Sequence, residues 1–220
     1  SGYHAIEFLL WGQDLNGTGP RAGARTYSDF LQGQGCSGGN CDRRGAYLQA
    51  ATDLLVTDLE EMTAAWGEGG AGSPAVTADP AAGLLAALTG IGSLSYGELA
   101  GERIKLGLML NDPEEEHDCF SDNTHNSHYY DGLGIRNVYL GQYVRVDGSV
   151  VTGESLSSLV AASDPAADAG LRAALDNSIA KLGMIKTAAE AGLSYDQMLE
   201  RGNKAGEALM LGAVDALVAQ

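Results

Sequence analysis

The chain contains 220 residues, with 29 acidic and 13 basic side chains and a formal net charge of −16. A protein this acidic is poorly suited to bind nucleic acid or an anionic membrane surface. Hydrophobic residues make up 45% of the chain, which is enough to bury a sizeable core. No apolar run approaches the roughly 18 residues that a transmembrane helix requires, so the sequence predicts no membrane-spanning segment.

The first predicted element is an apolar helix that opens with the motif GYHAIE at residues 2–7. His4 and Glu7 are three residues apart, so a helix projects their side chains from the same side. An imidazole nitrogen and a carboxylate oxygen placed in this way can bind one cation, or one group can hold a proton for the other. The alternative is that the two side chains only satisfy each other near a helix terminus.

A long loop rich in glycine, asparagine and serine is predicted over residues 12–42. Within this loop, Cys36 and Cys41 flank a glycine-rich stretch whose flexibility lets the two sulfur atoms meet. The sequence therefore predicts a Cys36–Cys41 disulfide, which fits an oxidising compartment. Two thiols on a metal ion are the alternative, although no second cysteine pair is present to complete a zinc site.

Helical periodicity runs through most of the remaining chain. Apolar residues recur at intervals of three and four over 48–66 and 171–189, which predicts two amphipathic helices. Asp-Pro pairs begin at residues 79, 112 and 164, and each predicts an Asp N-cap with proline at the first helical position. The apolar stripes consist of Leu48, Ala51, Leu55, Leu59, Met62 and Trp66, and of Leu171, Leu175, Ile179, Leu182, Ile185 and Ala189.

Two local patterns complete the predicted fold. β-Branched residues surround an Asp-Gly pair at 147–148, which predicts a small β-hairpin. Ser194 and Gln197 form a capping box that we expect to open the last helix. The prediction is an all-α fold: a single helical domain over residues 1–220, arranged as an up-and-down bundle with long loop insertions and one small hairpin.

Potential metal ligands are concentrated in residues 112–131. Three of the four histidines lie in this segment, at positions 117, 125 and 128, among many Asp and Glu residues. Mixed nitrogen and carboxylate donors suit zinc or iron better than calcium or magnesium, which prefer oxygen alone. A solvated loop of N-capping residues is an equally good explanation of the segment by itself.

Four segments of the chain resemble the imelysin-like proteins. Residues 2–12 are similar to the G-x-H-x-x-E signature of that family, and residues 97–103, 116–125 and 134–141 match later segments in the same order. The family includes bacterial insulin-cleaving membrane proteases and iron-regulated surface proteins. The resemblance thus implies either iron handling or peptidase activity, in a protein exported to the periplasm or the outer-membrane surface of a bacterium.

The iron-handling interpretation implies that the chain binds iron or zinc, or a small metal-bearing ligand. Two ligands one helical turn apart cannot complete a metal site, so we expect His4 and Glu7 to lie within a few ångströms of residues 116–125. The candidate metal ligands are His4, Glu7, His117, Asp118, Asp122 and His125.

The peptidase interpretation assigns the catalytic roles to His4 and Glu7, with Glu116 or Asp122 activating a metal-bound water. Arg103 and Ser121 are then assigned to substrate binding, although an ion pair between Arg103 and Glu102 explains the arginine as well. The zinc-protease signature H-E-x-x-H is missing from the sequence. A helical partner-binding domain without a metal is the third interpretation.

Family members carry a helical region before the signature, whereas here the signature starts at residue 2. The chain therefore resembles the C-terminal part of a longer protein, and we expect the missing N-terminal segment to be a partner that covers the apolar residues 6–11. Cys119 is then expected either to be buried or to pair with a cysteine of that segment.

Overall fold

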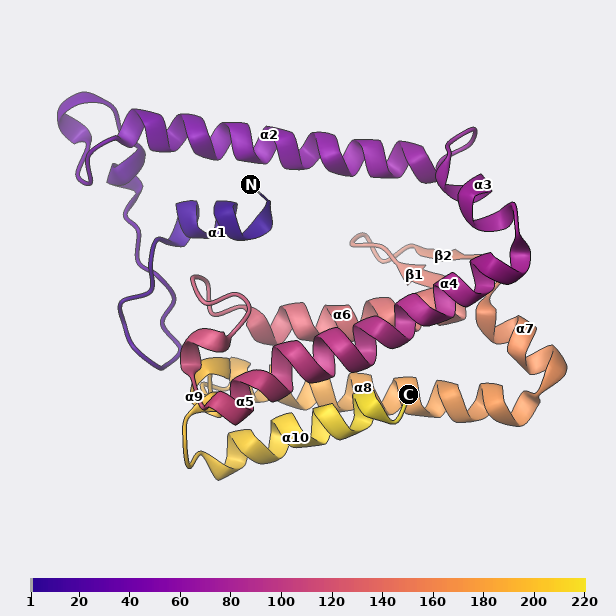
Figure 1. Cartoon of the computed structure of the whole chain (residues 1–220). Coiled ribbons are helices and arrows are strands. Elements are labelled where there is room, and N and C mark those ends of the chain that lie inside the picture. The colour runs from indigo at the N-terminus through magenta and orange to yellow at the C-terminus, as the bar shows by residue number, and fades with distance from the viewer. Residues whose placement is uncertain (1) are drawn as a thin grey trace. The chain divides into compact units, whose positions relative to one another are not determined.

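The computed structural model describes residues 2–220, which fold into two compact units (Figure 1). Unit 1 comprises residues 2–17, 21–83 and 118–122, and unit 2 comprises residues 18–20, 84–117 and 123–220. Helices dominate both units, and one two-stranded antiparallel sheet lies in unit 2. The prediction of an all-α bundle with a small hairpin is confirmed.

Unit 1 is built around one short and one long helix, α1 and α2, which pack against each other. Helix α1 ends at Trp11 because Gly12 adopts a positive φ of 78°, which interrupts the helix. The loop that follows contains only two short 3₁₀ turns, as the composition of residues 12–42 predicts. The elements of unit 1 are α1 (Tyr3–Trp11), η1 (Tyr27–Phe30), η2 (Gly33–Gly35), α2 (Cys41–Trp66), α3 (Gly72–Thr77) and the first residues of α4 (Pro80–Gly92).

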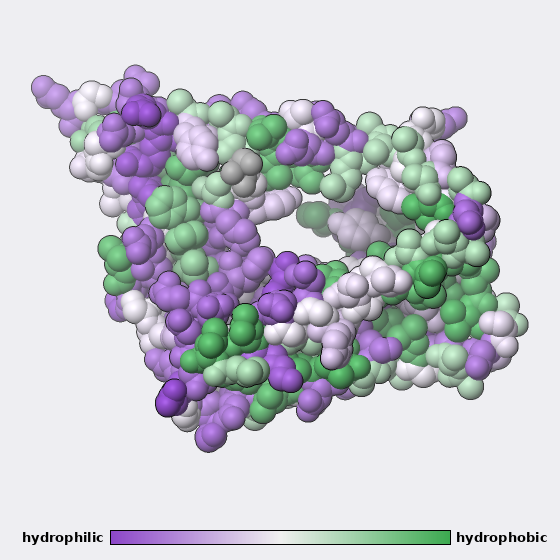
Figure 2. Space-filling model, viewed as in Figure 1, coloured by the Kyte–Doolittle hydropathy of each residue, from purple (hydrophilic) through white to green (hydrophobic). Residues whose placement is uncertain are grey.

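The predicted helix over 48–66 is confirmed as part of α2, but its apolar stripe is only partly buried. Ala51 is buried, whereas Leu59, Met62 and Trp66 are exposed. Figure 2 shows hydrophobic residues interspersed with hydrophilic ones along this helix. Burial of the stripe therefore decreases toward the C-terminal end of α2, so the periodicity predicts the helix correctly but not its burial.

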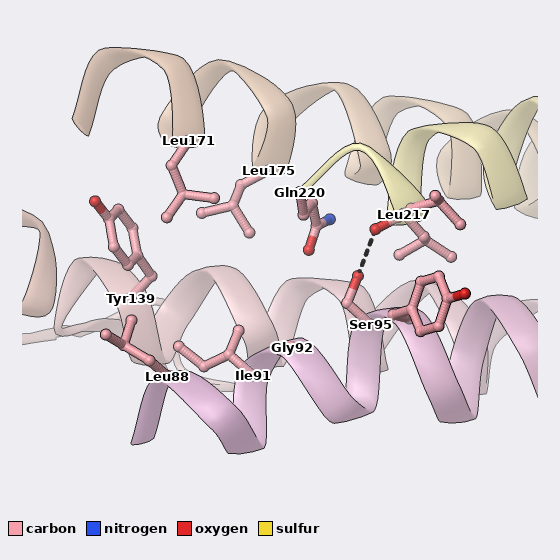
Figure 3. A pocket seen from close by; sticks show the side chains of 11 residues that line it. Leu88, Ile91, Gly92, Ser95, Tyr139, Leu171, Leu175, Leu217 and Gln220 are labelled. Carbon is pink, nitrogen blue, oxygen red and sulfur yellow. Dashed lines mark hydrogen bonds between the residues drawn. The ribbon is translucent and has the colours of Figure 1, made fainter. Parts of the chain in front are cut away.

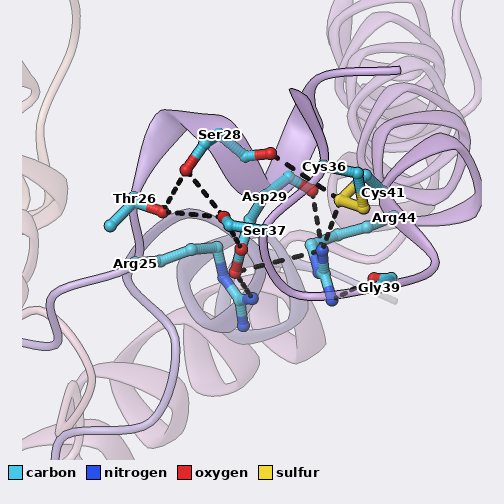
Figure 4. The surroundings of a disulfide bond; sticks show 9 residues. All are labelled: Arg25, Thr26, Ser28, Asp29, Cys36, Ser37, Gly39, Cys41 and Arg44. Carbon is cyan, nitrogen blue, oxygen red and sulfur yellow. Dashed lines mark hydrogen bonds and ion pairs between the residues drawn. A yellow bond between two sulfur atoms is a disulfide. The ribbon is translucent and has the colours of Figure 1, made fainter. Parts of the chain in front are cut away.

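The disulfide Cys36–Cys41 closes the long loop at the start of α2, with the two Cα atoms 5.8 Å apart (Figure 4). Asp29 organises the polar side of this loop. Its carboxylate accepts hydrogen bonds from Ser37 Oγ at 2.9 Å and Arg25 Nη1 at 3.1 Å. The hydrogen bond from Ser37, together with the charges of Arg44 and Arg25, holds the pKa of Asp29 below its usual value.

Unit 2 contains most of the apolar core. One cluster is formed by residues of η3, α8, α9 and α10, and a smaller cluster surrounds Ile135, Tyr139 and Leu175. The predicted stripe of α8 is confirmed, because Leu175, Leu182 and Ile185 are almost completely buried. The remaining elements are η3 (Ser93–Lys105), α5 (Leu106–Leu110), η4 (Pro113–Glu115), α6 (Thr124–Leu140), β1 (Gln142–Val144), β2 (Val150–Thr152), α7 (Leu156–Ser163), α8 (Pro165–Glu190), α9 (Tyr195–Leu199) and α10 (Lys204–Val218).

Helix η3 is π-helical over 13 residues, between α4 and α5. At its end, the Leu106 N–H bonds to the carbonyl of Gly101, five residues earlier, which is the hydrogen-bond pattern of a π-helix. The buried residues of η3 are separated by four, one and four positions, a spacing that fits the wider turn of a π-helix. They are Ser95, Leu99, Ala100 and Ile104. The sequence did not predict this segment as anything other than ordinary α-helix.

The predicted Asp-Pro caps are confirmed at all three positions. Asp79 and Asp164 each accept hydrogen bonds from two backbone N–H groups in the next turn, and Asp112 accepts one from Glu114 in the short η4. The capping box of Ser194 and Gln197 is also present, but it opens the short α9 and not the last helix. The last helix, α10, is capped by Asn203, whose side chain accepts the Gly206 N–H.

The hairpin has the predicted position, with Tyr143 opposite Val151 and a positive φ of 82° at Gly148.

An apolar cavity of about 190 Å³ lies between α4, α6, α8 and α10, where the two core clusters of unit 2 meet (Figure 3). Leu88 and Leu171 line it, and Ser95 Oγ donates to the carbonyl oxygen of Leu217 at 2.9 Å.

Among the described residues, no helix is both long enough and apolar enough to cross a membrane.

The first prediction concerns the disulfide. Replacing both Cys36 and Cys41 by serine should lower the free energy of unfolding by about 2 kcal/mol or less, because the bond closes a loop of only a few residues. Urea denaturation followed by circular dichroism measures this difference. A decrease in the free energy of unfolding well above about 2 kcal/mol would contradict this prediction, because the bond would then stabilise structure outside the loop that it closes.

The second prediction compares two glycines. A Cβ atom on Gly206 would lie 2.4 Å from the Cα of Met198, whereas one on Gly170 in α8 would have no neighbour within 4 Å. Gly206→Ala should therefore destabilise the protein by about 1–3 kcal/mol, because α9 and α10 must separate. Gly170→Ala is the matched control and should stabilise the protein by up to about 1 kcal/mol through helix propensity. Equal stability of the two variants in urea denaturation would contradict the close packing of α9 on α10.

Candidate functional site

The candidate site in unit 1 starts from His4 and Glu7 on the first turns of α1. Glu7 is buried, with 9% of its surface exposed. One of its oxygens, Oε1, accepts hydrogen bonds from the backbone N–H and the hydroxyl of Ser121, at 2.9 and 2.7 Å. The other oxygen, Oε2, lies 3.0 Å from His4 Nδ1. Ser121 thus fixes the carboxylate that faces the histidine.

Residues 118–122 pack against α1 in the same unit. Asp118 Oδ1 lies 3.5 Å from His4 Nδ1, and the ring of Phe120 contacts Phe8 edge to face with centroids 5.0 Å apart. The carbonyl of Phe120 also accepts the N–H of Gly23 at 2.9 Å. The segment is therefore held by a buried carboxylate, an aromatic pair and a backbone hydrogen bond.

This arrangement brings one imidazole nitrogen close to two carboxylates. The His4 side chain is 48% exposed, whereas those of Glu7 and Asp118 are only 10% and 14% exposed. His4 Nδ1 thus lies within hydrogen-bond or ion-pair distance of one oxygen of each carboxylate. Mixed nitrogen and carboxylate donors are of the kind that suits iron or zinc.

Asp122 ends the same segment in a left-handed backbone conformation, with φ at 52°. Aspartate adopts this conformation more readily than most residues, so the turn after Ser121 needs no glycine. The proposed role of Asp122 as a metal ligand stays a prediction.

Three other predicted site residues, Arg103, His117 and His125, lie in unit 2. Arg103 Nη1 donates to His117 Nε2 at 2.8 Å, and its guanidinium lies 3.7 Å from both Glu98 and Asp131. His125 lies in the first turn of α6, where its Nε2 is 3.1 Å from the side-chain nitrogen of Asn126. Arg103 therefore belongs to a polar network within unit 2, and its role in substrate binding stays a prediction.

His128 is a residue whose special environment the sequence did not indicate. It is 1% exposed and packs between His117 and Tyr195, with ring centroids 6.2 and 5.2 Å away. Neither of its ring nitrogens has a hydrogen-bond partner among the described residues. Burial, reinforced by the nearby His117 and Arg103, lowers the pKa of His128 to about 3.

The buried face of α6 would have located His128. This face consists of Thr124, His128, Gly132, Ile135 and Tyr139, which follow one another at helical intervals. Because His128 is the only titratable member of that stripe apart from Tyr139, the helical period marks it as a core histidine. When His128 is grouped with His117 and His125 only because they are close in the sequence, its position in the core is overlooked.

The family of the chain follows from comparison with models of protein families. The family model of imelysin matches residues 1–220, which is the whole chain. The chain belongs to the imelysin family. The family resemblance inferred from the sequence is thereby confirmed. Comparison with curated proteins finds no match for the chain.

The third prediction concerns the stability of the protein in acid. His128 takes up a proton near pH 6.5 when unfolded but only near pH 3 when folded, so acid favours the unfolded state. Between those values its contribution to the free energy of unfolding should fall by up to about 1.4 kcal/mol per pH unit, with no change above that range.

The variant His128→Leu removes this titration while filling the same buried position. The difference in stability between His128→Leu and the native chain should therefore grow in favour of the variant as the pH falls from about 6.5. Urea denaturation of both proteins at a series of pH values measures it. Both proteins contain the same carboxylates, so the titration of these groups cancels in the difference between their free energies of unfolding. A difference that does not change with pH would contradict the burial of a neutral histidine.

Proposed function

We propose that this member of the imelysin family is an exported iron-handling protein that binds a metal ion through His4, Glu7 and Asp118. The observation that supports this function is the position of His4 Nδ1, which lies 3.0 Å from one carboxylate and 3.5 Å from another. A histidine with two carboxylates is a donor set that suits non-haem iron. A bound ion would supply a Lewis-acid or redox centre at the half-exposed side of His4.

The residues of the chain set the form of this site. Ser121 occupies Glu7 Oε1, so Glu7 presents a single oxygen, Oε2, toward His4. Phe8 and Phe120, the neighbours of Glu7 and Ser121 in the sequence, contact each other edge to face and add an apolar contact between the two segments. The exposure of His4 leaves a route for an ion to enter from solvent.

Export is supported by the disulfide. A Cys36–Cys41 bond persists in an oxidising compartment such as the periplasm or the cell exterior, whereas cytosolic thiols are kept reduced. Together with membership of the imelysin family, this favours a role in metal uptake at the bacterial cell surface.

The fourth prediction tests this function by calorimetric titration of the intact chain with Fe(II) under anaerobic conditions, and separately with Zn(II). His4→Ala and Asp118→Asn should each weaken metal binding about tenfold or more, because each removes one ligand. Asp58→Asn is the matched control, since Asp58 is an exposed aspartate on α2 of the same unit. It should leave the affinity unchanged.

A proteolysis assay with an unfolded protein substrate separates this function from the peptidase alternative. The native chain should show no cleavage that a chelator abolishes. Chelator-sensitive cleavage that His4→Ala eliminates would instead assign the site to a metallopeptidase. Absence of saturable binding of either metal, with no cleavage, would contradict both functions and leave a helical partner-binding domain.

A further inference from the structure

A second concave surface lies wholly within unit 2, apart from the candidate metal site. It is a groove of about 770 Å³ between α6 and the first arm of the hairpin. This volume falls within the roughly 300–1,000 Å³ of small-molecule sites. The groove is lined by tyrosines 129, 130 and 143, arginines 136 and 145, and apolar and amide side chains.

The groove offers aromatic faces to a ligand. Tyr130 and Tyr143 are 58% and 52% exposed, from α6 on one side and β1 on the other. Tyr129 contacts Tyr130 edge to face, with centroids 5.2 Å apart, which restricts the position of the Tyr130 ring. Three of the nine tyrosines of the chain thus line one groove, so stacking of a planar ring is the contact that it offers best.

The charge of the groove is opposite to that of the protein. Two arginines line it, and no aspartate or glutamate is among its described lining residues, although acidic residues outnumber basic ones by 29 to 13 in the chain. Arg136 pairs through Nε with Asp176, an exposed partner whose attraction is weak in water. The side chain of Arg145 makes one described hydrogen bond, a long one of 3.5 Å from Nη1 to Ser149 Oγ.

We propose that this groove binds a planar aromatic anion, such as an aromatic carboxylate. The guanidinium groups of Arg145 and Arg136 bind the anionic group, because arginine presents paired N–H donors that match a carboxylate. The tyrosine rings stack on the aromatic part. This site is independent of the metal site proposed for unit 1, since no residue is shared between them.

The fifth prediction tests this proposal with 2-naphthoate, titrated into the intact chain and followed by calorimetry. Arg145→Gln and Tyr130→Leu should each weaken its binding about tenfold or more, through loss of a charge-assisted hydrogen bond or of the stacked ring. Arg201→Gln is the matched control, because Arg201 is an exposed arginine outside the groove. It should leave the affinity unchanged, and circular dichroism should confirm that every variant is folded.

Three matched probes define the ligand class. 2-Naphthamide lacks the charge and cyclohexanecarboxylate lacks the aromatic ring, so both should bind more weakly than 2-naphthoate. Absence of saturable naphthoate binding, or equal binding by Arg145→Gln and the native chain, would overturn the proposal. A neutral oligosaccharide that binds where naphthoate does not would overturn it as well and assign the groove to carbohydrate.

Discussion

The buried carboxylate of Glu7 is the constraint on which the candidate metal site depends. Removing a carboxylate from water costs several kcal/mol unless hydrogen bonds compensate for the loss of hydration. Ser121 supplies two such bonds, from its backbone N–H and its hydroxyl, to the same oxygen. These bonds join segments that are 114 residues apart in the chain, and they place Asp118 beside His4. The Phe8–Phe120 ring pair and the His4–Asp118 pair add to the contact between α1 and residues 118–122.

The same solution recurs at two other buried carboxylates, those of Asp168 and Asp196. Asp168 accepts hydrogen bonds from the hydroxyls of Ser157 and Tyr139, at 2.5 and 2.9 Å, and the bond from Ser157 lowers its pKa. Burial and the hydrogen bond to Asp168 raise the pKa of Tyr139 to about 12, so the tyrosine remains a donor. Asp196 is bound by the hydroxyl of Ser194 and the N–H of Gly19. In a chain with 13 cationic side chains for 29 acidic ones, hydroxyl and N–H donors thus supply hydrogen bonds to the buried carboxylates of Glu7, Asp168 and Asp196.

The sequence predicted those parts of the fold that depend on short-range chemistry. The Asp-Pro caps, the α8 stripe and the Asp-Gly hairpin follow from the conformational preferences of a few neighbouring residues, and all are present. The wide turns of η3 were not predictable in this way, because π-helical hydrogen bonds are stabilised by packing of Leu99 and Ile104 in the core and not by a local signal. The site shows the same division: helical spacing predicts that His4 and Glu7 lie on one side, but the contact between Glu7 and Ser121 depends on tertiary folding.

The hydrogen bonds of Ser121 also bear on the metal site that we propose for these residues. Because Glu7 Oε1 accepts two hydrogen bonds, only Oε2 can bind an ion without loss of those bonds. Glu7 would then be a monodentate ligand, and His4 and Asp118 would each add one donor atom. A site with so few protein donors would leave room for water or an incoming ligand on the ion, whereas a structural site is closed by protein groups. The exposure of His4 and the burial of both carboxylates give such a site one open side, which suits an ion that is bound and released more than one that is stored permanently.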